Sequence, residues 1–165
     1  MSENEAAQLD FVVEWGAATD RGVRRDLNED RYLASPPVFL VADGMGGHEL
    51  GDVAAEAVID AFGTCRPGAW LTSNAVHEAV ALAVAAINGI GSTGAASPGS
   101  TLAGAGMTIQ DGLPCWLVFN VGDSRTYRLA RGILEQVSVD HSQVQEMVDA
   151  GVIGLEEART HSRRS

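Results

Sequence analysis

The feature that most restricts how this chain can fold is a continuous run of five apolar residues, at positions 38–42. Two prolines, Pro36 and Pro37, interrupt the chain just before this run, and Asp43-Gly44 ends it. An apolar run of this length is typical of a strand that is buried on both faces. The chain of 165 residues is long enough to enclose such a strand in one domain with a real core.

The other strand-like segments are clustered, and short turns separate them. Strand-like segments are predicted at residues 11–15, 31–34, 101–109, 115–121, 126–129 and 133–139, and the first of them is rich in β-branched and aromatic residues. Asp111-Gly112 and Gly122-Asp123 supply turns between three of them. Clustered strands joined by short turns favour an antiparallel α+β architecture over alternating βαβ units.

Helical patterns occur in four places. An apolar stripe at residues 53–62 predicts one helix. Residues 73–88 predict a second, with Ser73 as N-cap and Gly89 as C-cap. Because residues 79–87 are apolar nearly all round, we expect that part of the second helix to be buried. Two more helices are predicted at residues 142–150 and from residue 155 onward.

The charge balance limits the classes of partner. With 22 acidic and 11 basic residues, the formal net charge is −11. Such a chain suits cation binding but neither nonspecific nucleic-acid binding nor an anionic membrane surface. No apolar run approaches the roughly 18 residues that a membrane-spanning helix needs, and the acidic N-terminus is unlike a secretory signal. We therefore expect a cytoplasmic protein that binds neither nucleic acid nor membrane.

Acidic residues stand at the ends of the predicted strands. Glu29-Asp30 lies in a polar loop, Asp43 ends the apolar run, and Asp123 follows another strand. Carboxylates at strand ends suit hard divalent cations, and two such ions can activate a hydroxide for in-line attack on phosphorus. The neighbouring Arg25 is a suitable donor to a phosphate oxygen. On spacing alone, plain turns and a solvated loop remain the alternative interpretation.

Five segments, in order along the chain, resemble the motifs of PPM-type (type 2C) phosphatases in their bacterial form. They are residues 19–30, 41–48, 99–102, 120–127 and 139–161. The second reads Val-Ala-Asp-Gly-Met-Gly-Gly-His, and the fourth contains Val-Gly-Asp-Ser-Arg. The resemblance implies an α+β fold, with an antiparallel β-sandwich flanked by helices, over residues 11–165. Residues 1–10 would precede it as a disordered tail.

The same resemblance implies a role for each site residue. Asp43 would bridge two catalytic Mn²⁺ or Mg²⁺ ions, and the Gly44 carbonyl and Glu29 would bind one of them. Asp30 would hold a water molecule bound to a metal, and Asp123 would serve a third, weaker metal site. Arg25 matches the phosphate-binding arginine of the family. Arg24 does not fit that spacing and is interpreted as a surface charge.

The implied activity is hydrolysis of phosphoserine and phosphothreonine in proteins by a water that two metal ions activate. Phosphorylated proteins, including Ser/Thr kinases, are the implied partners, and we expect a monomer. The family's two further metal-binding aspartates are not found before Ser165, so the domain is expected to be truncated. Two alternatives stay open: a truncated, inactive PPM-like binding or regulatory module, and a small carboxylate-rich metal-binding protein.

Overall fold

The computed structural model describes residues 12–46, 50–65, 68–91, 97–141, 151–152, 154 and 157. Within them, two strands precede two helices, and five strands follow. The first strands are β1 (Asp30–Ser35) and β2 (Val38–Met45), and the helices are α1 (Leu50–Gly63) and α2 (Ser73–Ile90). The later strands are β3 (Gly99–Ser100), β4 (Leu102–Gln110), β5 (Leu113–Val121), β6 (Tyr127–Ala130) and β7 (Ile133–Gln136).

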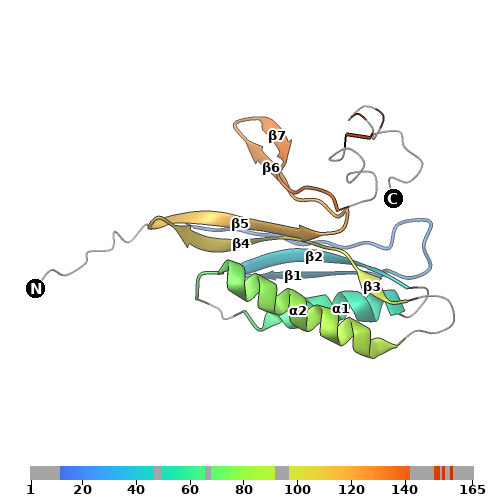
Figure 1. Ribbon diagram of the computed structural model, residues 1–165. Coiled ribbons are helices and arrows are strands. Elements are labelled where there is room, and N and C mark those ends of the chain that lie inside the picture. The colour runs from blue at the N-terminus through green and yellow to red at the C-terminus, as the bar shows by residue number, and fades with distance from the viewer. Residues whose placement is uncertain are drawn as a thin grey trace, which may run out of the picture.

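One antiparallel sheet organises the described part of the chain. Its strands follow the order β1-β2-β4-β5, and β3 pairs with the end of β2. Strands β6 and β7 form a separate hairpin. Figure 1 shows both helices on one face of the sheet and this hairpin on the other side. The predicted α+β class is confirmed: of the predicted antiparallel β-sandwich flanked by helices, the described residues form one antiparallel sheet, the two helices on one of its faces, and the hairpin.

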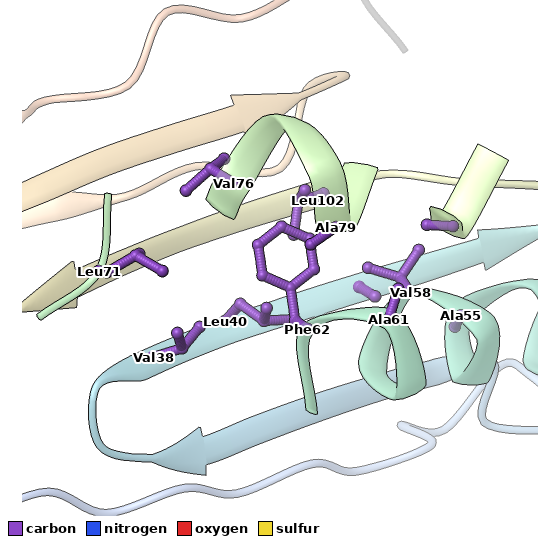
Figure 2. Close-up of a cluster of buried hydrophobic side chains, with 12 residues drawn as sticks. Val38, Leu40, Ala55, Val58, Ala61, Phe62, Leu71, Val76, Ala79 and Leu102 are labelled. Atoms are coloured by element: carbon purple, nitrogen blue, oxygen red, sulfur yellow. The ribbon is translucent and has the colours of Figure 1, made fainter. Parts of the chain in front are cut away.

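The core lies between the sheet and the helices. On β2, Val38, Leu40 and Ala42 point toward the helices and are buried. The ring of Phe62, from α1, is fully buried and stacks on Phe119 of β5 at a centroid distance of 5.3 Å. Figure 2 shows Phe62 of α1 among the other buried apolar side chains, which include Val38 and Leu40 of β2. Burial of this layer is the main force that fixes the helices on the sheet.

Six of the seven predicted strands are present, with bounds that differ by a few residues, and two strand predictions need correction. Residues 12–15 form no strand, because no described strand offers them hydrogen bonds. Instead, the Trp15 ring packs on Phe39, with centroids 5.7 Å apart. Strand β2 is buried on one face only, since its residues alternate and Val41 is 48% exposed. The apolar run therefore indicates a strand with two apolar faces. The helices cover only one of these faces.

The helix predictions are confirmed for α1 and α2 in type but not in every detail. The N-cap of α2 is Thr72, whose hydroxyl accepts a hydrogen bond from the Ala75 amide at 3.2 Å. The helix continues through Gly89 and ends at Gly91, which has a φ of 79°. Leu82 and Val84 are exposed, because α2 packs mainly on α1 and so only one of its faces is covered. The helices predicted at 142–150 and from 155 onward, and the tail at 1–10, lie outside the described residues or almost entirely so.

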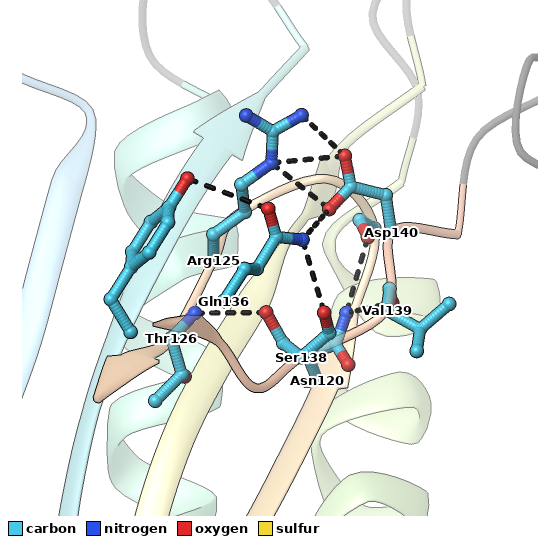
Figure 3. Close-up of polar contacts among 9 residues, drawn as sticks. Asn120, Arg125, Thr126, Gln136, Ser138, Val139 and Asp140 are labelled. Carbon is cyan, nitrogen blue, oxygen red and sulfur yellow. Dashed lines mark hydrogen bonds and ion pairs between the residues drawn. The ribbon is translucent and has the colours of Figure 1, made fainter. Parts of the chain in front are cut away.

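Polar contacts attach the segment after β7 to the end of β5. Arg125 donates two hydrogen bonds from Nε to the carboxylate of Asp140, at 3.0 Å each, and this pairing raises the pKa of Arg125. Asn120 donates to the carbonyl of Val139 at 2.8 Å, and the Thr126 amide donates to Ser138 at 2.9 Å. Figure 3 shows this network around the start of β6. It fixes the turn between β5 and β6, which carries Asp123.

Candidate active site

Asp43 and Asp30 lie opposite each other on neighbouring strands. They are directly paired in the register of β1 and β2, so their side chains project from the same face of the sheet. Partial burial raises the pKa of Asp43, and the charge of Asp30 and a hydrogen bond with Asp30 raise it further. The charge of Asp123 also raises this pKa, whereas that of Arg25 lowers it. Three carboxylates and one guanidinium therefore act on one another at the end of β2.

Thr101 joins the end of β2 to the turn that carries Asp123. Its amide donates to the Asp43 carbonyl at 2.9 Å, and its hydroxyl accepts from the Asp43 amide at 3.2 Å. The same hydroxyl lies 2.6 Å from that of Ser124. A Cβ at Gly122 would lie 2.9 Å from the Thr101 side chain, so this turn is packed against β4 as well as bonded to it. Thr101 thus sets the position of Asp43 relative to Asp123.

Glu29 projects into a narrow space between β2 and α1. Its Oε1 atom is buried and has no hydrogen-bond partner among the described residues. Its carbonyl accepts a hydrogen bond from the Gly44 amide at 3.2 Å. The space exists because of two glycines: a Cβ on Gly44 would lie 1.8 Å from the Gly51 carbonyl oxygen, and one on Gly51 would lie 2.4 Å from Glu29 Oε1. A buried carboxylate oxygen of this kind needs a compensating donor or cation.

Arg31 holds the acidic loop against α1. Its guanidinium donates to the carbonyls of Asn28 and Asp30, at 3.0 and 2.9 Å. The same group pairs with Glu56 at 3.1 Å and with Asp52 at 3.4 Å, both on α1. Arg31 therefore fixes the backbone on either side of Glu29.

A cleft of about 630 Å³ opens above these residues. Glu29, Asp30, Asp43 and Gly44 line its floor, and the loop at residues 20–28 forms its wall. That loop contributes Arg21, Arg24 and Arg25 to the lining. Asp123 lies outside the lining but within electrostatic reach of Asp43. All six residues singled out from the sequence are thus brought to one region.

The donor set suits a hard divalent cation but does not complete a site for one. Carboxylate and carbonyl oxygens are the ligands that Mg²⁺ and Mn²⁺ take. The partnerless oxygen of Glu29 and the crowded carboxylates of Asp30 and Asp43 would both gain from a bound cation. Nevertheless, no three His, Cys, Asp or Glu side chains converge to ligand distance within the part of the chain that the structure describes.

Sequence reasoning missed the residues that position this site. Arg31 was read only as the start of a strand, and its partners on α1 lie 21 and 25 residues away. Thr101 lies in a motif that was recognised without a role for its hydroxyl. Gly51 carried no signal at all, because the space it leaves for Glu29 appears only once α1 is placed.

Comparisons with known proteins agree with the motifs. No family model matches the chain. The serine/threonine protein phosphatase PstP of Mycobacterium tuberculosis is 36% identical over 96% of this chain and 31% of PstP. The serine/threonine phosphatase Stp of Listeria monocytogenes is 34% identical over 89% of this chain and 62% of Stp. The chain therefore spans about a third of the first relative and about three fifths of the second.

Solved structures show the same likeness. The crystal structure of M. tuberculosis PstP/Ppp superposes with a TM-score of 0.72 and 34% identity, over 88% of this chain and 62% of that one. A structure of the PstP catalytic domain in complex with two manganese ions gives a TM-score of 0.67 and 34% identity, over 84% and 60%. None of these names supports the alternative of an inactive binding module. The chain belongs to the PPM-type (type 2C) family of serine/threonine phosphatases and corresponds to part of that family's domain.

Proposed function

We propose that this chain provides a metal- and phosphate-binding face of a protein phosphatase that hydrolyses phosphoserine and phosphothreonine. The observation that carries the proposal is the meeting of Asp43, Asp30 and Arg25 at the end of β2, in one open cleft. The named relatives are phosphatases, and one of them is known with two manganese ions bound. Phosphorylated proteins, with Ser/Thr kinases among them, are the substrates and partners that we propose.

Asp43 is the proposed bridge between two cations, Mn²⁺ or Mg²⁺. The Gly44 carbonyl and Glu29 would serve one of these cations, and Asp123 a third. Bound cations would neutralise the carboxylates and activate water for attack on phosphorus. Asp30, which pairs with Asp43 in the strand register, would accept a hydrogen bond from a metal-bound water molecule and so orient it.

Arg25 is the proposed phosphate ligand. Within the described residues its guanidinium forms no ion pair, unlike those of Arg31, Arg125 and Arg128. A guanidinium that forms no ion pair can bind an anion, and its planar donors match phosphate oxygens. Its position beside Asp43 would bring the phosphoryl group close to the carboxylates.

The test measures phosphate release from a phosphothreonine peptide by the chain in Mn²⁺, with chelator and with Asp43→Asn as comparisons. We expect release that requires Mn²⁺ and that Asp43→Asn reduces by at least about 100-fold, the scale on which loss of preorganised charge acts. An Asp111→Asn variant, which removes a carboxylate from the β4–β5 turn, should retain the activity. Release that persists in chelator, or no release at any Mn²⁺ concentration, would overturn the proposal.

A further inference from the structure

Six of the seven arginines in the described part of the chain fall into two groups, and the seventh, Arg131, is exposed in the β6–β7 turn. Arg31, Arg125 and Arg128 each pair with a carboxylate. The three arginines of the loop at residues 20–28 pair with none, and all three line the cleft. In a chain with a net charge of −11, three arginine side chains that line one cleft and form no ion pair need an explanation.

The loop is built to hold its arginines in place. Asn28 donates from Nδ2 to the Thr19 hydroxyl at 2.8 Å, which closes the loop at its base. Inside it, the Gly22 amide donates to Asp20 at 2.6 Å, in a turn where Gly22 has a φ of 70°. Arg21 donates from Nη1 to the Asp26 carbonyl at 3.5 Å and so braces the loop from within. Within this loop, that leaves Arg24 and Arg25 as the guanidinium groups for which the described structure has no hydrogen bond.

Arg24 and Arg25 stand in different relations to the carboxylates. The charge of Arg25 acts on Asp43, which places it beside the reacting centre. Arg24 lines the same cleft and is exposed, and its charge is not among those that shift the pKa of Asp43. The remaining acidic residues of that wall are Asp20, which is engaged by the Gly22 amide, and Asp26. Three arginines therefore face two aspartates along the wall.

The geometry points to Arg24 as a specificity residue that binds a second anionic group of the substrate, beside the phosphorylated residue held by Arg25. This inference rests on the proposed function of the same cleft. The ligand is a phosphopeptide whose neighbouring residue carries a carboxylate or another phosphoryl group. Both are planar or multi-oxygen anions that a guanidinium binds through two donors.

The experiment compares three labelled peptides of one sequence that share a central phosphothreonine. Two positions away, the first carries Ala, the second Glu and the third another phosphothreonine. Their dissociation constants are measured by fluorescence anisotropy in Mn²⁺ for the wild-type chain, Arg24→Gln and Arg131→Gln. Arg131 is the matched control, because it is exposed in the β6–β7 turn, away from the cleft, and forms no ion pair in the described structure.

We expect the wild type to bind the Glu and doubly phosphorylated peptides about three- to tenfold more tightly than the Ala peptide, the size of one solvated ion pair. Arg24→Gln should abolish this preference and leave the affinity for the Ala peptide unchanged, whereas Arg131→Gln should keep both. High salt should reduce the preference. A gain confined to the doubly phosphorylated peptide would support the inference with phosphate as the second anion.

Three results would overturn it: no preference in the wild type, a preference that survives Arg24→Gln, or an equal loss in Arg131→Gln. Phosphate release is recorded in parallel, so that the two proposals fail separately. A preference that depends on Arg24 without any phosphate release would sustain this inference and overturn the proposed hydrolysis. Phosphate release without a preference for the Glu or doubly phosphorylated peptide would sustain the proposed hydrolysis and overturn this inference.

Discussion

Asp43 shares the end of β2 with Asp30 and lies within electrostatic reach of Asp123. These neighbours and partial burial raise its pKa, which means that its charged form is disfavoured in the fold without metal. Asp43→Asn should therefore raise the melting temperature in chelator by roughly 1–3 °C. The same variant should lose most of the stabilisation that Mn²⁺ gives the wild type, since a principal ligand is gone.

Thermal melts in chelator and across a Mn²⁺ titration test this prediction. Asp111→Asn is the control, because it removes one negative charge from an exposed turn and Asn tolerates the φ of 52° found there. If Asp43→Asn lowered the melting temperature in chelator, or if Mn²⁺ stabilised it as much as the wild type, the assignment of Asp43 would be wrong.

Arg25 and Arg24 are adjacent in sequence, but only Arg25 acts on Asp43. Where phosphate release is measurable, Arg25→Ala should mainly raise KM for a singly phosphorylated peptide, by about tenfold or more, because a charged contact with the bound phosphate is lost. Steady-state kinetics of the two alanine variants on that peptide provide the measurement. A larger KM effect from Arg24→Ala would show that the register of the first motif is misassigned.

At the scale of elements, the contact between the end of β2 and the first turn of α1 shapes the site. No side chain fits at Gly44, since its Cβ would lie 1.8 Å from the Gly51 carbonyl oxygen. Gly44→Ala should therefore push α1 away from β2 and lower stability by about 2–4 kcal/mol, as backbone overlap in a packed region does. Gly89→Ala in α2 meets nothing within 4 Å and should stabilise by about 0.5–1 kcal/mol.

Chemical denaturation of both glycine variants gives the two free energies of unfolding. Each variant adds one methyl group. If Gly44→Ala and Gly89→Ala lowered the free energy of unfolding equally, the change in backbone conformational freedom, and not the contact between β2 and α1, would determine the stability of both. A neutral Gly44→Ala would mean that Glu29 is not confined by this contact.

The strands and helices that the sequence predicted correctly are those whose signals are local. Strands β4 and β5 follow from two strand-like segments on either side of the Asp111-Gly112 turn, and α1 follows from its apolar stripe. Burial could not be predicted in the same way. The apolar runs of β2 and α2 look alike on both faces, and only the packing of α1 between them decides which face is covered.

The candidate site shows the same division. Asp43, Glu29 and Arg25 were found through motifs that resemble a family, because each is a conspicuous residue type at a characteristic spacing. The contacts of Arg31 and Thr101 depend on α1 and on the β5–β6 turn, which lie far away in sequence. Such long-range contacts follow from the tertiary fold and leave no periodic trace in a single sequence.

At the scale of the whole molecule, the two faces of the sheet differ in what covers them. One face holds the core beneath the helices. The other carries Phe39, whose ring contacts those of Trp15 and Trp116 at centroid distances of 5.7 and 5.8 Å. These rings line a groove of about 660 Å³ beside the β6–β7 hairpin. Neither described helix is long and apolar enough to cross a membrane.

A contiguous apolar surface of this kind should bind the dye ANS while the chain is folded. Trp116 is 53% exposed and lines this groove, whereas Leu82, also 53% exposed, lies on α2 and is not part of the groove. Trp116→Gln should therefore cut ANS fluorescence by about half or more, because it interrupts the groove, whereas Leu82→Gln should change it little.

ANS titrations of the three proteins, with circular dichroism to confirm that each is folded, test this expectation. Light scattering at rising protein concentration supplies a second measurement, since an apolar face that is open to water also promotes self-association. The net charge of −11 opposes that association, so scattering should increase with salt in the wild type and in Leu82→Gln, and less in Trp116→Gln. Equal ANS binding by all three proteins would mean that the aromatic face is covered in solution, by residues outside the described part of the chain or by a second copy.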